Sequence, residues 1–163
     1  TVSFDKFEYS QAKRAIDAFF FHTFCDNYLE IVKDRLYNPD TRGDDAKCSA
    51  QYTLYTALKI VTQLYAPLCP YVTDKVHREL YGDTVHTTQW PQVNEQLIQD
   101  TEIADKLVEH IALVRKHKSD NQVSLGSSVD TVTIPFDPEK YVDDFKAVTR
   151  AERVETGQEF NVN

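Results

Sequence analysis

The feature that most constrains this chain is the run of residues 9–37, which contains neither proline nor glycine. Apolar side chains recur along it three and four residues apart, the spacing that places them on one face of an α-helix. The repeating positions are Ala12, Ile16, Phe19, Phe20, Phe24, Tyr28, Ile31 and Val32. The run therefore predicts one long amphipathic helix, for which Ser10 is a suitable N-cap.

Three further segments have helical spacing. A loop at residues 38–43 precedes a second long helix, which Asp44 or Asp45 can cap and which ends before Pro67. A shorter helix over residues 71–80 stops at Gly82, and a fourth covers residues 101–118. Because long helices joined by short loops pack antiparallel, the sequence predicts a helical bundle over residues 1–120.

The pattern changes in the last part of the chain. Residues 130–134 alternate and are rich in β-branched side chains, which is typical of a half-buried strand. Asp137 and Pro138 can open a helix, and residues 154–162 can return as a strand. We therefore expect a mainly α fold, with a small C-terminal α/β appendage over residues 121–163 and a linker at 121–128.

Charge limits the classes of partner. The chain has a formal net charge of −8 and a pI near 5.0, whereas nucleic-acid binding through bulk electrostatics requires clustered lysine and arginine. Any nucleic-acid interface must therefore rest on local basic patches. The sequence contains neither a signal-peptide pattern nor an apolar run of the roughly 18 residues needed to span a membrane, so we expect a cytoplasmic protein and no membrane partner.

One feature predicts reduced cysteines, and another predicts a fragment of a larger protein. Cys25, Cys48 and Cys69 are odd in number and widely spaced, which suits neither a disulfide framework nor a metal knuckle. We expect reduced, buried thiols. The chain starts at Thr1 and contains no methionine, which favours an excised fragment.

The sequence contains no pattern typical of catalysis. Glycine-rich phosphate loops, G-x-S-x-G elbows and H-E-x-x-H pairs do not occur. His22, Cys25 and Asp26 lie on neighbouring parts of one helix surface, but no second group of ligands accompanies them. We therefore predict no catalytic, cofactor-binding or metal site.

Two helix ends carry candidate nucleic-acid contacts. Arg115, Lys116 and Lys118 end the fourth helix, and Lys33 and Arg35 lie near the end of the first. Such cations can simply complement the helix dipole, an effect worth about 0.3–1 kcal/mol, or Lys33 can pair with Glu30. They can also bind phosphates through charge-assisted hydrogen bonds. The residues alone favour the dipole interpretation. Among the nearby phenylalanines, Phe21 is the one most expected to lie off the core face.

An ordered set of motifs then suggests a family. Residues 24–33 read FCDNYLEIVK, residues 64–74 read LYAPLCPYVTD, and Trp90-Pro91 precedes the fourth helix. This order resembles the anticodon-binding bundle of class I aminoacyl-tRNA synthetases, and the resemblance covers about residues 4–150. Residues 114–119 (VRKHKS) look most like valyl enzymes, with isoleucyl enzymes next. Lys75 and His77 depart from the pattern, which usually has an acid and a tryptophan there.

The resemblance implies a function for the whole protein and for this part of it. The parent would be an ATP-dependent valine–tRNA ligase, but the family's H-I-G-H and K-M-S-K-S elements do not occur here, so this chain should be inactive alone. Its expected partners are tRNA, of the valine type, and the catalytic domain of the same chain; we expect a monomer. Lys33, Arg35, Arg115, Lys116 and Lys118 are the predicted tRNA contacts. The alternatives are the isoleucyl module or a helical protein-interaction domain, with a small enzyme ranked last.

Overall fold

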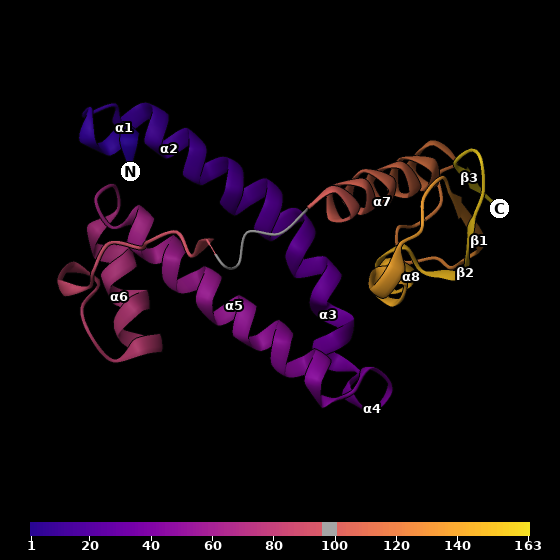
Figure 1. Ribbon diagram of the computed structural model, residues 1–163, viewed down its shortest axis with the longest axis horizontal. Coiled ribbons are helices and arrows are strands. Elements are labelled where there is room, and N and C mark those ends of the chain that lie inside the picture. Colours follow the sequence, from indigo (N-terminus) through magenta and orange to yellow (C-terminus); the bar gives the residue numbers. More distant parts are fainter. Residues whose placement is uncertain (96–100) are drawn as a thin grey trace. The chain divides into compact units, whose positions relative to one another are not determined.

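The computed structural model describes residues 1–95 and 101–163 and shows a mainly helical chain with one small sheet (Figure 1). The chain forms two compact units. Unit 1 combines Thr1–Leu29 with Pro39–Glu95, and unit 2 combines Glu30–Asn38 with Gln96–Asn163, of which residues 101 onward are described. The segment between Trp90-Pro91 and the predicted fourth helix lies partly outside the described residues.

Unit 1 is built from helices. They are α1 (Val2–Asp5), α2 (Tyr9–Asp17), the π-helical segment η1 (Ala18–Tyr28), α4 (Pro39–Arg42), α5 (Asp44–Tyr65), α6 (Pro70–Tyr81) and the 3-10 turn η2 (Val85–Thr87). The predicted helix over residues 9–37 is present as α2, η1 and then α3 (Leu29–Tyr37). Glu8, not Ser10, occupies the N-cap of α2, and its side chain makes no capping bond.

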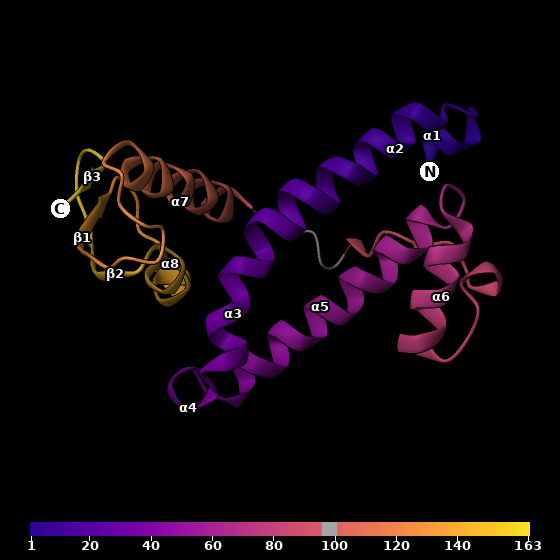
Figure 2. The same cartoon turned by 180° about the vertical axis from the view of Figure 1, so that it is seen from behind.

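The helix α5 packs against α2 and α6 inside unit 1, and α5 and α6 lie side by side in two opposite views (Figure 1, Figure 2). It begins after Gly43, whose φ of 84° is easily adopted only without a side chain, so Asp44 and Asp45 stand in its first turn and not at its cap. The Tyr65 hydroxyl donates a 2.6 Å hydrogen bond to Asp17 of α2. No described helix is both long and apolar enough to cross a membrane.

The turn after α6 is held by one carboxylate. Gly82 ends α6 in the left-handed conformation, as the sequence predicts. Asp74 then accepts hydrogen bonds from the Arg78 guanidinium at 2.7 Å, from the Thr84 hydroxyl and from the Val85 N–H at 3.1 Å. These donors lower the pKa of Asp74 to about 2.

Unit 2 has a sheet with helices packed against it. Its elements are the α3 residues from Glu30 onward, α7 (Glu102–Asp120), β1 (Val129–Ile134), the 3-10 turn η4 (Glu139–Tyr141), α8 (Val142–Thr149), β2 (Ala151–Thr156) and β3 (Asn161–Val162). The sheet order is β2-β1-β3, with β1 parallel to β2 and antiparallel to β3. A parallel pair needs a crossover, and α8 provides it. The predicted strand and helix are therefore confirmed, whereas the returning strand predicted over residues 154–162 is two strands, β2 and β3, of which β2 starts at Ala151.

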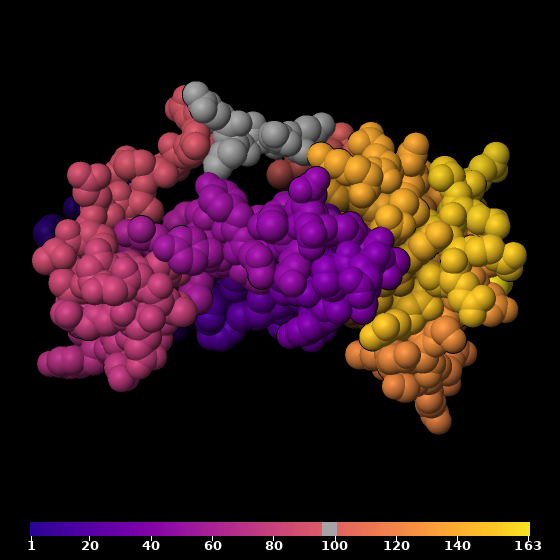
Figure 3. Space-filling model, turned by 90° about the horizontal axis from the view of Figure 1, so that it is seen from below, coloured from indigo at the N-terminus to yellow at the C-terminus, as the bar shows by residue number. Residues whose placement is uncertain are grey.

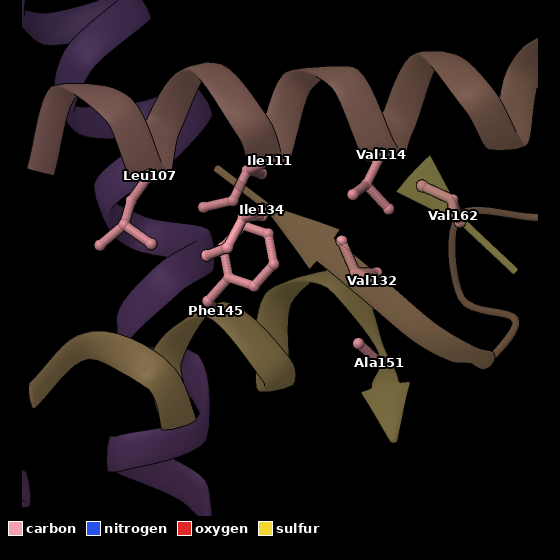
Figure 4. Packing of buried hydrophobic residues seen from close by; sticks show 8 residues of the cluster. All are labelled: Leu107, Ile111, Val114, Val132, Ile134, Phe145, Ala151 and Val162. Atoms are coloured by element: carbon pink, nitrogen blue, oxygen red, sulfur yellow. The ribbon is translucent and has the colours of Figure 1, made fainter. Parts of the chain in front are cut away.

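The helix α7 belongs to the core of unit 2, although its helical spacing was interpreted as the fourth member of the bundle. Figure 4 shows its apolar side chains pointing toward the sheet and α8, in one cluster of Leu107, Ile111, Val114, Val132, Ile134, Phe145, Ala151 and Val162. The boundary predicted at residue 120 thus differs from the division in the structure. Helical spacing shows which face of α7 is apolar but does not identify the surface that covers it.

A buried ion pair attaches α3 to the rest of unit 2. The Arg35 guanidinium donates two hydrogen bonds to the Asp144 carboxylate of α8, one of them 2.8 Å long. The Asp144 side chain is only 4% exposed. Ile31 packs against the same hydrophobic core one turn earlier in α3. Breaking such a pair by removing one partner leaves an uncompensated buried charge.

A buried lysine closes the other end of this core. Lys118 is 2% exposed, and its ammonium donates to the carbonyl oxygens of Leu125, Ser127 and Thr149 at 3.1, 2.6 and 2.8 Å. Thr149 is the last residue of α8, where carbonyls have no helical partner and the dipole favours a cation. Burial, together with the positive charge of Arg150, lowers the pKa of Lys118.

We expect the stability of unit 1 to depend on Asp74 in acid. Its folded-state pKa of about 2 lies below the ordinary value of 3.8, so the stabilisation is complete above pH 4 and is lost as the pH falls toward 2. Urea unfolding of the chain and of Asp74→Asn between pH 2 and 6 measures this. The variant should lose part of the acid dependence, while Asp5→Asn, at an exposed carboxylate of the same unit, should keep it. Parallel curves for the chain and Asp74→Asn would contradict the assignment.

We also expect Lys118→Met to destabilise unit 2. Methionine fills a similar volume but leaves three carbonyls without their donor, and each buried acceptor left unsatisfied costs about 1–3 kcal/mol. Urea unfolding should show a loss of at least about 1 kcal/mol. The matched control is Lys116→Met, two residues away and exposed, which should change stability by no more than about 0.5 kcal/mol. Equal midpoints for the two variants would show that the buried hydrogen bonds contribute nothing.

Candidate nucleic-acid interface

Two of the five predicted RNA-binding residues are occupied inside unit 2. Lys118 donates three hydrogen bonds to backbone carbonyls, and Arg35 binds Asp144 through two nitrogens of its planar guanidinium. A buried ammonium with three acceptors has no donor left for a phosphate in this conformation. The structure thus gives Lys118 and Arg35 roles in packing, and we correct the predicted surface set by leaving them out of it.

Lys33 lies at the surface in a weak ion pair. Its ammonium is 2.6 Å from the Glu30 carboxylate on the same helix, and the two side chains are 55% and 43% exposed. Exposed pairs of this kind contribute only about 0–1 kcal/mol, because water screens both charges. The predicted pairing with Glu30 is confirmed, and it is weak enough for an approaching phosphate to replace the carboxylate.

Arg115 and Lys116 project differently from Lys118. The buried residues of α7 include Leu107, Val114 and Lys118, which continue one helical stripe. Lys116 lies on the exposed face, and Arg115 is half-buried between the two. The basic run is therefore divided between the core and the surface. The spacing of four residues from Val114 to Lys118 is the sequence signal that could have identified the buried lysine.

The phenylalanines of η1 follow the expected division in part. Phe24 is buried, with its ring stacked on Tyr28 at a centroid distance of 6.0 Å. Phe21 is 50% exposed, which confirms that it lies off the core face, but Phe19 is also exposed, at 41%. The π-helical turns of η1 shift side chains from the positions that 3.6-residue spacing predicts.

The three cysteines are free, as expected, but they are not all buried: Cys25 is half-buried, and Cys48 and Cys69 are exposed. Burial and the negative charge of Asp26 raise the pKa of the Cys25 thiol. His22 Nδ1 and the Asp26 carboxylate are 3.3 Å apart on the exposed side of η1. In the part of the chain that the structure describes, no group of three potential ligands could hold a metal ion.

The motif residues far apart in the sequence meet around one pocket in unit 1. Its volume is about 390 Å³, and its lining includes Pro67, Pro70 and Trp90. Gln63 lines the same pocket and donates through its amide to the Thr88 hydroxyl and the Gln89 carbonyl. The two prolines that shape the turn and the tryptophan of the W-P pair therefore form one structural feature.

The two departures from the family pattern have separate surroundings. His77 is fully buried, with its Nδ1 3.2 Å from the Thr62 hydroxyl and its ring 4.6 Å from that of Tyr81. Lys75 lies at the surface and pairs with Glu79 at 2.8 Å, which raises the pKa of Lys75. The histidine thus fills an interior position, while the lysine changes only surface charge.

Two aromatic residues that the sequence patterns did not single out lie on the outer side of α5. Tyr52 is 69% exposed and Tyr55 is 54% exposed. They are three residues apart and lie away from the buried stripe that Ala50 and Val61 occupy. Their helical position off the stripe of Ala50 and Val61 is the sequence signal that could have identified them.

Comparisons with known proteins agree with this architecture. The chain is 35% identical to the valine–tRNA ligase of Wolbachia pipientis wMel over 161 residues, which covers 92% of this chain and 18% of that protein. It is 40% identical over 134 residues to the valine–tRNA ligase of a Wolbachia from Brugia malayi (strain TRS), covering 79% of this chain and 15% of the relative. With the enzyme of Methanothrix thermoacetophila the identity is 34% over 151 residues, or 93% and 17% of the two chains.

The chain therefore spans less than a fifth of the length of these relatives. A family model described as the anticodon-binding domain of tRNA ligase matches residues 1–134. That match includes every motif from Phe24 to Lys118 on which the resemblance was based. The chain belongs to the family of anticodon-binding domains of tRNA ligases.

Proposed function

We propose that this chain is the tRNA-binding module of a valine–tRNA ligase and docks the anticodon arm of a valine-type tRNA. The match to the anticodon-binding family over residues 1–134 carries this proposal. The valine–tRNA ligases among the relatives favour valine over isoleucine, which is the runner-up. The module would act in the cytoplasm, as a monomer within the larger protein.

In this proposal the chemistry belongs to a catalytic domain of the same protein. That domain would bind ATP and valine and join valine to the tRNA. This chain contains neither H-I-G-H nor K-M-S-K-S, so it contributes affinity and orientation. Docking of the anticodon arm fixes where the far end of the tRNA can reach.

Lys33, Arg115 and Lys116 are the proposed phosphate-binding residues, and all three belong to unit 2. Lys116 is exposed, and none of the ion pairs among the described residues involves it. Lys33 can exchange Glu30 for a phosphate at little cost. These residues set affinity and register, whereas reading of the anticodon requires interactions with bases.

Replacing these three cations by glutamine should weaken tRNA binding and reduce its salt dependence. For each phosphate interaction that the substitutions remove, the slope of log affinity against log salt should fall by about 0.7–0.9. The measurement is a titration of fluorescently labelled valine tRNA at several salt concentrations. The urea midpoint should change little, because the three side chains lie outside the buried core.

The control for charge alone is Lys75→Gln, which removes an exposed cation of unit 1 and should leave the slope unchanged. Competition with isoleucine tRNA tests whether the module prefers a valine-type tRNA. An unaltered slope in the triple variant would remove these residues from the interface. Failure of the unaltered chain to bind any tRNA would refute the function itself and favour a protein-interaction module.

A further inference from the structure

We propose that the outer face of α5 is a stacking platform for unpaired bases of the RNA. The platform consists of Tyr52 and Tyr55, with Lys59 and Tyr81 beside them. This inference rests on the proposed function and deepens it, because it assigns the reading of single-stranded RNA to unit 1.

Tyr55, one of the two exposed rings of the platform, is held in place by its neighbours. The Tyr55 and Tyr81 rings meet edge to face at a centroid distance of 4.9 Å, and the Tyr81 hydroxyl donates a 3.0 Å hydrogen bond to the Tyr55 carbonyl. Lys59 Nζ is 5.6 Å from the centre of the Tyr81 ring. Tyr55 is therefore supported by Tyr81 and is still 54% exposed. Part of the surface of α5, in purple to magenta, is visible beside α6 in Figure 3.

The charge of this segment differs from that of the rest of the chain. All 26 acidic residues lie outside residues 46–73, which contain Lys47 and Lys59. Nearly the whole of α5 and the turn after it thus carry no negative side chain, in a chain of net charge −8. Along this stretch α5 itself adds no repulsion toward a polyanion, and the nearest acids of the adjoining segment, Glu79 and Asp83, flank Tyr81.

The side chains of the platform select bases in preference to backbone. Tyrosine rings stack on the faces of unpaired bases, whereas in a duplex those faces are covered by neighbouring pairs. Around the rings, the exposed surface of α5 carries Gln51, whose amide can donate and accept hydrogen bonds, and Thr53, whose hydroxyl donates to the Ser49 carbonyl at 2.9 Å and can still accept. An RNA loop offers unpaired bases that can stack on the rings and form hydrogen bonds with these side chains, whereas a continuous RNA duplex does not.

The test uses the 163-residue chain and two RNA probes: a stem–loop with the valine anticodon arm sequence, and a duplex of the same stem without the loop. The loop carries 2-aminopurine, whose fluorescence is quenched by stacking. Tyr52→Ala, alone and with Tyr55→Ala, should weaken stem–loop binding by at least about fivefold, the lower end for loss of one stacked base. In complexes with both variants, the 2-aminopurine fluorescence should be higher than in the complex with the unaltered chain. The slope of log affinity against log salt should be unchanged.

Two controls separate stacking from folding. Tyr52→Phe with Tyr55→Phe keeps the ring faces and should bind the stem–loop within about twofold of the unaltered chain. Tyr71→Ala removes an even more exposed tyrosine, at 91%, from α6 and should have no effect. Because Tyr55 packs on Tyr81, Tyr55→Ala can lower the urea midpoint and so weaken binding through a loss of stability. Tyr52 belongs to none of the ring pairs among the described residues, so the binding of Tyr52→Ala alone decides whether stacking is lost.

Unchanged stem–loop affinity in both alanine variants would overturn the platform and leave the proposed function intact. An equal loss of affinity for the loop-free duplex would also overturn it, because the tyrosines would then not be reading unpaired bases. If the unaltered chain bound neither tRNA nor the stem–loop, the platform and the proposed function would fail together.

Discussion

The structure of unit 2 depends on the apolar stripe of α7 and on the way that stripe ends. Leu107, Ile111 and Val114 bury one side of the helix against the sheet, and Lys118 occupies the next position on the same side. An ammonium there would be costly without partners, and three backbone carbonyls provide them. The lysine thereby fixes the segment that leads into β1 and the end of α8, so one side chain connects helix, linker and crossover.

This arrangement explains why a basic run is a poor measure of a nucleic-acid interface. Lys118 and Arg35 carry charge in the sequence, but Lys118 donates to three backbone carbonyls and Arg35 is paired with the buried Asp144. Lys116 and Lys33 remain at the surface, where charge is available to a polyanion. With a net charge of −8, the proposed attraction to RNA would come from these local sites and from the part of α5 beyond Asp45, which carries no acidic residue.

The two units suggest a division of labour that fits the proposed function. Unit 2 presents flexible cations, which suit a backbone that is the same in every RNA. Unit 1 presents Tyr52 and Tyr55, whose rings suit unpaired bases. Its pocket around Trp90 and Pro70 is a separate feature, in which the Gln63 amide is already bound to Thr88 and Gln89. The motif residues there build the turn that orients α6.

The sequence by itself determined the helices, the C-terminal strands, the family and the exclusion of a catalytic motif, because these depend on local spacing and on residue identity. It could not assign α7 to its partner, since a helix shows which face is apolar but not what covers it. Nor could it show that Arg35 is engaged inside the protein, because its partner Asp144 lies more than a hundred positions along the chain. Whether a charge faces phosphate or a buried partner is decided by residues distant in sequence, and only the tertiary structure brings them together.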